Sequence, residues 1–577
     1  MQQFRVWAPK AQTVEVKFGD ARTALEQTHG GWWQVAILSA GPGTDYGYIV
    51  DGEEPAVPDP RSLWQPEGIH KASRVYDHSA FGWSDGGWRA PVFPSAVVYE
   101  LHIGTFTSEG TFDAAIAKLD WLKELGITHV EVLPVVAFPG HRGWGYDGVD
   151  LFAVYEPYGG PEGLKRLVDA AHGKGLAMIL DVVYNHFGPD GNYTGKFAPY
   201  LTSLHTTPWG DAVNFEDAGS HEVRRFFIDN ALMWLRDYHF DGLRLDAVTA
   251  YMDRSATNFM EELAREIREL EAETGRNLVV IAESDLNDPQ LVSAPEAGGY
   301  GLDAAWSDDF HHSLVTFLTG DRTGYYADFG TLPDLAKALE SVYVYDGGYS
   351  EHRDRHHGRP VRGLPGWRFL GYSQNHDQVG NRARGERLVH LVGEKRAKIA
   401  AALVLTAPFV PMLFQGEEFA ASAPFQYFTD HEEELGLLVS KGRKREFEAF
   451  GWDPDQIPDP QAESSFTDSK LDWSEVGEGC HAAMVDWYKR LIELRKTTPE
   501  LVNGRMDDVT VSIDEEDLWL VMDRAAIQVA CNFGSEPLQI SLPPGSVLLL
   551  GSDEVTFEGD EVTLPPDSVS VVRVGHE

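Results

Sequence analysis

The sequence predicts an α/β protein, a (β/α)8 TIM barrel with an N-terminal β-sandwich domain and a small C-terminal β-sandwich domain. Three observations predict this class. Short alternating strands divided by Gly, Pro and Asp turns fill residues 1–88, and similar strands return from 506 to 577. Between them, strands alternate with helices, a pattern typical of a parallel sheet. Eight strand–helix units favour a closed barrel over an open sheet, so the catalytic barrel is expected over residues 95–500.

The N-terminal segment is typical of an all-β sandwich. Alternating runs such as Val14–Phe18 and Trp32–Ile37 predict strands with one buried face, and a Gly-Pro-Gly turn at 41–43 separates two of them. The run 88–94 contains Pro91 and Pro94 and is expected to link this domain to the barrel. The N-terminal domain should therefore end near residue 88.

The barrel elements follow in chain order. Apolar or alternating runs bounded by turn residues predict eight strands, at 96–106, 127–135, 176–186, 240–246, 277–284, 302–310, 367–377 and 409–415. Amphipathic patterns predict helices at 112–125, 163–175, 222–238 and 255–273, another within 386–406, and a last helix at 482–496. A long acidic and aromatic insertion occupies about 417–480.

Composition excludes several functional classes. The 577 residues carry a formal net charge of −42, which would repel nucleic acid and anionic membrane surfaces. A hydrophobic content of 43% supports a large core. Cys480 and Cys531 are the two cysteines, which predicts no disulfide framework and a reducing compartment. No signal peptide or membrane span is expected, so the predicted location is cytoplasmic. These observations predict no oligomeric state.

The strand at 240–246 ends in a charged pair. Side chains alternate along a strand, so Arg244 and Asp246 should lie on the same side. At the C-terminal end of a barrel strand, Asp246 would point into a cavity. A neighbouring guanidinium favours the ionised form of a carboxylate, which is what a nucleophile needs. An ordinary Arg–Asp ion pair is the alternative for an isolated strand.

Three further strands end in polar residues that complement this pair. The third ends with Asp181, Asn185 and His186, the fifth with Glu283, and the seventh with His376 and Asp377. Strand ends converge on one face of a barrel, so these groups should share one pocket. Ionised carboxylates that lie close together repel one another, so one of them should keep a proton and serve as an acid. Such a set suits glycosidic bond cleavage.

These four segments resemble, in order and position, the signature regions of the α-amylase superfamily, glycoside hydrolase family 13. A fifth match is Gly145-Tyr146 with Asp150. The resemblance implies a retaining mechanism with Asp246 as nucleophile, Glu283 as general acid and base, and Asp377 as transition-state stabiliser. It also implies substrate-binding roles, and these fall on Tyr146, Asn185, His186, Arg244 and His376. The N-terminal domain would be the immunoglobulin-like, glucan-binding type found in several members.

Longer segments resemble the trehalose-releasing members of this superfamily. They are 98–119, 306–326, 424–452 and 464–473. The resemblance implies hydrolysis of the α-1,4-glucosidic bond next to the terminal trehalose of maltooligosyltrehalose, which releases trehalose and a maltooligosaccharide. A glycogen branching enzyme, a debranching enzyme for α-1,6 bonds and a non-catalytic glucan-binding protein remain alternatives. A binding protein would have no need for a costly buried acidic trio.

One departure from the family pattern concerns the leaving group. Typical α-amylases carry Lys and His three and four residues after the nucleophile, whereas this chain has Thr249 and Ala250. A different leaving group, such as trehalose, is therefore expected. Asp308 and His311, just past the sixth strand, are candidates to bind it, with loop capping as the alternative.

Other polar and aromatic residues are weaker candidates. Trp144 and Trp209 are either sugar platforms or loop anchors, and Glu417 and Glu418 follow the eighth strand at the expected active face. The loop after His186 lacks a regular calcium-binding spacing. No metal or other cofactor is predicted, and the expected partner is an oligosaccharide substrate.

Overall fold

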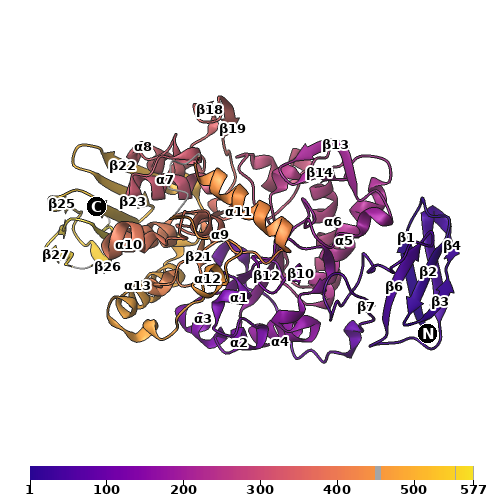
Figure 1. Ribbon diagram of the computed structural model, residues 1–577. Helices are drawn as coiled ribbons and strands as arrows, with labels where there is room; N and C mark the ends of the chain where they lie inside the picture. Colours follow the sequence, from indigo (N-terminus) through magenta and orange to yellow (C-terminus); the bar gives the residue numbers. More distant parts are fainter. Residues whose placement is uncertain (449–455, 553, 576–577) are drawn as a thin grey trace.

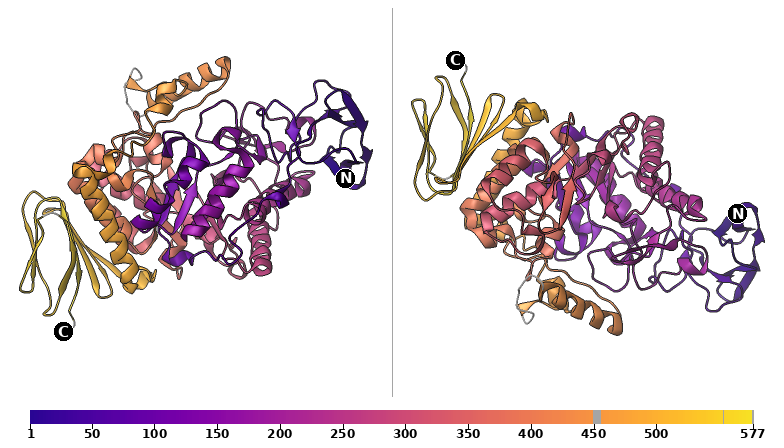
Figure 2. Two further views of the ribbon diagram at one scale, coloured as in Figure 1. Left: turned by 90° about the horizontal axis from the view of Figure 1, so that it is seen from below. Right: turned by 90° about the horizontal axis from the view of Figure 1, so that it is seen from above.

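The computed structural model describes residues 1–448, 456–552 and 554–575. A central barrel lies between an N-terminal β part and a C-terminal β part, which occupy opposite ends of the molecule (Figures 1 and 2). The last four residues of the segment 424–452 and three residues of the predicted C-terminal domain lie outside the described ranges.

The N-terminal part consists of two antiparallel sheets with the strand orders β1-β5-β4 and β3-β2-β6-β7. Phe4 and Tyr46 meet edge to face between them, with ring centroids 4.9 Å apart, and both are buried. The strands are β1 (Gln2–Trp7), β2 (Val14–Phe18), β3 (Ala21–Ala24), β4 (Glu26–Gln27), β5 (Trp32–Ile37), β6 (Asp45–Val50) and β7 (Ser73–Arg74).

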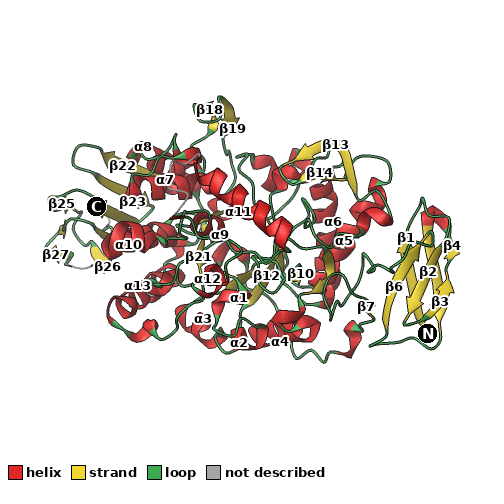
Figure 3. Cartoon of the chain, viewed as in Figure 1, coloured by secondary structure: helices red, strands yellow, loops and turns green. Residues whose placement is uncertain are grey.

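Eight parallel strands close into a barrel in the order β12-β15-β16-β17-β20-β21-β8-β9, which confirms the predicted fold class. Each strand lies beside the one that precedes it in the barrel sequence, and helices surround the ring (Figure 3). The barrel strands are β8 (Val98–Leu101), β9 (His129–Val132), β12 (Ala177–Val182), β15 (Gly242–Leu245), β16 (Val279–Ala282), β17 (Ala304–Trp306), β20 (Phe369–Gly371) and β21 (Val410–Phe414).

The helices of the barrel occupy most of the predicted positions. They are α1 (Ile103–Phe106), α2 (Phe112–Ile116), α3 (Leu119–Leu125), α4 (Gly160–Lys174), α5 (Ser220–Asp237), α6 (Phe259–Thr274), α7 (Asp308–Thr319), α8 (Leu332–Ser341), α9 (His376–Gly380), α10 (Leu388–Thr406) and α13 (Gly479–Thr497). None of the helices within the described ranges is long and apolar enough to cross a membrane.

Two boundary predictions are wrong for local reasons. The single helix expected over 112–125 is divided into α2 and α3, because the Lys118 N–H bonds to the Ala115 carbonyl, three residues back, at 2.9 Å. The first, sixth and seventh strands are shorter than predicted because the helices α1, α7 and α9 begin within the residues assigned to them. Asn375 caps α9, where its side chain accepts a 2.7 Å hydrogen bond from the Gln378 N–H.

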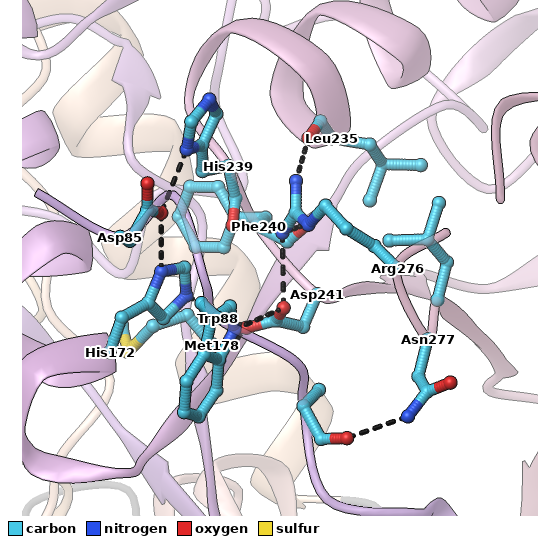
Figure 4. A network of polar contacts seen from close by, with 12 residues as sticks. Asp85, Trp88, His172, Met178, Leu235, His239, Phe240, Asp241, Arg276 and Asn277 are labelled. Carbon is cyan, nitrogen blue, oxygen red and sulfur yellow. Dashed lines mark hydrogen bonds and ion pairs between the residues drawn. The ribbon is translucent and has the colours of Figure 1, made fainter. Parts of the chain in front are cut away.

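A buried polar network attaches the segment after the N-terminal sheets to the strand-start end of the barrel (Figure 4). The Asp241 carboxylate, just before β15, accepts hydrogen bonds from the Trp88 indole and from the Met178 N–H, both at 2.9 Å. His172 lies between two carboxylates, 2.9 Å from Asp241 and 2.8 Å from Asp85. The predicted linker is therefore fixed to the barrel at its beginning.

The remaining elements are hairpins, the insertion helices and the C-terminal sheets, whose strand orders are β22-β23-β24-β29-β26 and β25-β28-β27. Arg524 anchors these sheets, since its guanidinium donates to the Thr406 carbonyl at the end of α10. The elements are β10 (Val136–Ala137), β11 (Asp150–Val154), β13 (Leu201–Thr207), β14 (Gly210–Val213), β18 (Asp346–Ser350), β19 (Arg355–Gly358), α11 (Glu433–Glu448), α12 (Glu463–Thr467), β22 (Val509–Asp514), β23 (Trp519–Arg524), β24 (Ile527–Asn532), β25 (Leu538–Ser541), β26 (Val547–Gly551), β27 (Thr556–Glu558), β28 (Glu561–Leu564) and β29 (Ser568–Arg573).

Candidate active site

The predicted acids meet at the C-terminal ends of the barrel strands. Asp246 follows β15, Glu283 follows β16, and Asp377 lies in α9 after β20. All three line one cavity of about 560 Å³ together with Tyr146, His186, Trp209 and His376. Residues separated by more than a hundred positions in the chain thus share one pocket, as the barrel geometry requires.

Arg244 lies beneath the pocket and holds two carboxylates. Its side chain is fully buried, and its Nη1 donates to Asp246 at 2.8 Å and to Asp181 at 2.7 Å. This contact agrees with the prediction that Arg244 and Asp246 lie on one side of the strand. The guanidinium also lies 4.2 Å above the Trp306 ring and 3.8 Å from the Glu283 carboxyl. Arg244 therefore fixes the position of Asp246 and approaches Glu283 from below.

Burial favours the protonated form of Glu283. Its Oε2 accepts a 2.5 Å hydrogen bond from the Ala247 N–H, and Ala247 takes a left-handed conformation with φ of +40°. Burial raises the pKa of Glu283 to about 8, with Arg244 opposing the shift and the charges of Asp246, Asp308 and Asp377 adding to it. A carboxyl group with this pKa can donate a proton near pH 7.

His376 is a charged hydrogen-bond donor next to Asp377. Its Nδ1 donates to a Glu100 oxygen at 2.6 Å, and its Nε2 lies 3.6 Å from Asp377. Burial disfavours the charged ring, but the carboxylates of Asp377 and Glu100 raise the pKa of His376 to about 9. Asp377 is the most open of the three acids, with 40% of its side chain exposed. It can thus reach a ligand in the pocket.

Tyr146 and His186 form one wall of the pocket. The Tyr146 hydroxyl donates to Asp181 at 2.6 Å, and His376 Nε2 lies 2.8 Å from the same hydroxyl. His186 Nε2 lies 3.0 Å from the Tyr146 carbonyl. The exposed Trp209 ring stacks on His186 with centroids 4.7 Å apart and an interplanar angle of 6°. This wall offers an aromatic face and polar edges, which suits a sugar ring.

The other predicted substrate-binding residues do not line the cavity. Asn185 is fully buried, and its side-chain polar atoms have no hydrogen-bond partner among the described residues. Asp308 opens α7, accepts a hydrogen bond from the Tyr372 hydroxyl and is close enough for its charge to raise the pKa of Glu283. Burial raises the pKa of Asp308 itself to about 7. His311 is 2% exposed. The structure therefore brings Asp308 near the acids but not His311 into the pocket.

The expectation for Glu417 and Glu418 is wrong. Both are buried, at 5% and 0% exposure, and face helices outside the barrel. Glu417 accepts a 2.7 Å hydrogen bond from the Tyr488 hydroxyl, and Glu418 accepts a 3.1 Å bond from the Trp121 indole. Trp144 is an anchor in the pocket wall, since it is 6% exposed and its indole donates to the Gln426 carbonyl at 2.9 Å.

Three further acids lie inside the barrel, and sequence reasoning missed two of them, Glu100 and Glu131. Glu100, Glu131 and Asp181 are at most 1% exposed. Burial raises the pKa of Asp181 to about 6 and raises the pKa of Glu131 well above its ordinary value. The signal was a charged residue inside each of three apolar strands, because such a group needs a partner or a proton. Within the described ranges, no group of three or more His, Cys, Asp or Glu side chains is arranged to hold a metal ion.

A closed barrel with three carboxylates, two histidines and an arginine at its strand ends defines a glycoside hydrolase of the α-amylase type. The alpha amylase catalytic-domain model matches residues 75–203, and a domain of unknown function, DUF3459, matches residues 504–571. The chain is 48% identical to the malto-oligosyltrehalose trehalohydrolase of Rhizobium sp. (strain M-11), over 99% of this chain and 97% of that protein. It belongs to the malto-oligosyltrehalose trehalohydrolase family.

The chain is also similar to a second trehalohydrolase, to a branching enzyme and to a solved structure. The trehalohydrolase of Mycobacterium tuberculosis (strain H37Rv) is 46% identical over 99% of both chains. A 1,4-alpha-glucan branching enzyme from Rubrobacter xylanophilus is 31% identical over 72% of this chain and 60% of that protein. Among solved structures, an α-amylase-like protein from Salmonella typhimurium has a TM-score of 0.91 and 36% identity, covering 100% of this chain and 97% of that one.

Proposed function

We propose that the chain is a retaining α-glycosidase that hydrolyses the α-1,4-glucosidic bond next to the terminal trehalose of maltooligosyltrehalose. The products are trehalose and a maltooligosaccharide. The observation that carries the chemistry is the pair of Asp246 and Glu283 around one guanidinium, with the pKa of Glu283 raised to about 8. The trehalohydrolase names of full-length relatives support the choice of substrate.

In the first step, Asp246 attacks the anomeric carbon while Glu283 gives its proton to the glycosidic oxygen. The bond to the leaving group breaks, trehalose departs with the proton, and the rest of the chain is held as an ester of Asp246. Arg244 fixes Asp246 for this attack through the 2.8 Å contact. Asp377 and the charged His376 would hydrogen-bond hydroxyl groups of the distorted sugar.

In the second step, the Glu283 carboxylate takes a proton from water as that water attacks the same carbon. The ester bond to Asp246 breaks, the maltooligosaccharide leaves, and Glu283 is protonated again. Two displacements at one carbon keep the anomeric configuration. The product should therefore appear first as the α-anomer, which proton NMR resolves before mutarotation.

The leaving-group end of the pocket supports trehalose as the departing sugar. The short 3-10 turn Val248–Ala250 follows Asp246 and presents the small residues Thr249 and Ala250, and Ala250 is buried. Asp308 lies close enough to Glu283 for its charge to raise the pKa of that acid. We propose that Asp308 acts on the leaving-group side, whereas the buried position of His311 gives it no such contact.

The test offers the full chain maltotriosyl-trehalose and amylose in separate reactions. Trehalose release from the first substrate, with one new reducing end per cleavage, is the expected result. Loss of iodine colour from amylose without new reducing ends would instead indicate branching activity. Asp246→Asn should lower turnover by about four orders of magnitude or more while leaving the fold intact. The exposed Asp211→Asn is the matched control.

A further inference from the structure

A second cavity, of about 650 Å³, lies between the N-terminal part and the barrel. Its walls come from five parts of the chain: the segment 65–71, which precedes β7, residues 137–141 at β10, residues 155–157, Asp190, and residues 430–432 in the insertion. In Figure 1, β7, the last strand of its N-terminal sheet, lies on the side of the sheets that faces the barrel. The volume is within the range of about 300–1,000 Å³ that is typical of small-molecule sites.

The walls of this cavity are fixed by hydrogen bonds between distant segments. The Trp64 indole donates to Glu156 at 2.6 Å, which joins the N-terminal segment to the barrel wall. The His141 N–H donates to the Asp430 carboxylate at 2.7 Å, which joins the loop after β10 to the insertion. Gly140 is required there, since a Cβ atom would lie 2.2 Å from the Asp430 carbonyl oxygen. The cavity is therefore pre-formed.

The surface of the cavity suits a neutral sugar. Ile69, Ala137 and Phe138 provide an apolar floor and are at most 5% exposed, whereas the histidines His70 and His141 are exposed at the edge. Apolar floors with a few polar groups match the carbon faces and hydroxyl edges of glucose. Acidic lining residues outnumber the single lysine, so an anionic ligand is disfavoured: Glu67, Glu156, Asp190, Asp430 and Glu432 against Lys71.

The cavity shares a wall with the catalytic pocket. His431 lines the second cavity, and its Nε2 lies 3.4 Å from the carboxylate of Asp147, which lines the catalytic pocket. Pro189 lines the catalytic pocket, and its neighbour Asp190 lines the second cavity. The Nδ1 atom of His431 is buried without a hydrogen-bond partner among the described residues.

We propose that this cavity is a second α-glucan-binding site that holds a maltooligosaccharide segment apart from the bond being cleaved. The identity of the ligand rests on the proposed function, because the neighbouring pocket handles the same class of neutral glucan. The fixed walls, the apolar floor and the excess of carboxylates are features of the structure that do not depend on the proposed function. Binding here would increase the affinity for glucans without contributing to the chemical step.

The test counts maltoheptaose sites on the full chain carrying Glu283→Gln, which prevents hydrolysis. Calorimetric titration should give two sites. Adding the two substitutions His70→Ala and His141→Ala to the Glu283→Gln protein should lower the maltoheptaose affinity of one site about tenfold. This is the loss expected for two hydrogen-bonding side chains. His221→Ala removes a histidine that is 78% exposed and lines neither cavity, so it is the matched control. A single site in the Glu283→Gln protein would overturn the proposal.

Two further measurements keep the outcome clear. Crystals of the Glu283→Gln protein soaked in maltoheptaose should show glucose residues between Ile69 and His141, and an empty cavity would overturn the proposal even if the double variant folded poorly. In the active chain, the double variant should release trehalose from maltosyl-trehalose within about twofold of the parent rate. Failure of the parent to release trehalose would reject the proposed function, while the count of maltoheptaose sites would still decide this proposal.

Discussion

Replacing Glu283 by Gln should abolish activity and also stabilise the protein, by an amount that grows with pH. The pKa of this carboxyl is raised from 4.5 to about 8 by burial, so its charged form is disfavoured in the folded state. Below pH 4.5 the carboxyl is protonated in both the folded and the unfolded state, so the shift in its pKa does not change the free energy of unfolding. Between pH 4.5 and 8 the unfolded chain loses the proton and the folded chain keeps it, so stability falls as pH rises.

The size of this effect follows from the shift. Each pKa unit corresponds to about 1.4 kcal/mol, so the wild-type protein should lose about 3 kcal/mol of unfolding free energy between pH 4.5 and 7. The loss approaches about 5 kcal/mol above pH 8, where both states are ionised. The amide introduced by Glu283→Gln has no titrating proton and can still accept the Ala247 N–H bond, so the variant escapes this penalty.

Equilibrium urea unfolding of both proteins at several pH values measures the difference. The gap between variant and parent should be small near pH 5 and should widen steadily to pH 8. Glu67→Gln makes the same carboxyl-to-amide change at an exposed position and is the matched control. A gap that stays constant from pH 5 to pH 8 would refute the argument that burial keeps Glu283 protonated.

Three other perturbations test the site and the fold. The value of kcat/KM should fall tenfold for each pH unit above about pH 8. Asp308→Asn should move the start of this fall to lower pH, because the charge of Asp308 raises the pKa of Glu283. An unchanged midpoint in the pH–rate profile would contradict this. Trp209→Ala removes an exposed ring in the pocket and should raise KM about tenfold with little change in kcat, so a loss confined to kcat would exclude a platform role. His172→Ala removes the imidazole that lies between Asp241 and Asp85, while Arg276 still pairs with Asp241, and it should lower the free energy of unfolding by about 2 kcal/mol, measured in urea, with kcat unchanged. An unaltered unfolding midpoint would show that the network in Figure 4 contributes nothing to stability.

The barrel could be predicted from the sequence because its strands and helices differ in period and alternate regularly. Element ends could not be placed as well, since they depend on capping contacts such as that of Asn375. The strand-end acids were predictable because parallel strands carry their C-terminal residues to one face. His311 was misjudged because α7 begins at Asp308, and one turn further along the side chain is already enclosed.

The acids Glu100 and Glu131 could not be assigned from the sequence because their partners appear only when the barrel closes. Glu100 lies in β8, which pairs with β21 and β9, and it meets His376 from the far end of the chain at 2.6 Å. Within a single strand, such a residue is indistinguishable from a solvent-facing glutamate. The period of the hydrophobic pattern in the sequence identifies β8 as a strand, but only the closed barrel shows that both faces of this strand are buried.

The distribution of one positive charge explains why Glu283 carries the proton among the acids that line the pocket. Arg244 donates to Asp181 and Asp246 at 2.7 and 2.8 Å but remains 3.8 Å from Glu283. A buried cation favours ionisation most strongly in the carboxylates it touches, so the acid at the larger distance gains least. The second cation, His376, is bonded to Glu100 on one side and lies near Asp377 on the other. Of the three predicted acids that line the pocket, Glu283 is therefore the one with the weakest contacts to these two cations. The buried carboxylates of Asp181 and Glu100, which hold Arg244 and His376, help to determine which residue can act as the general acid.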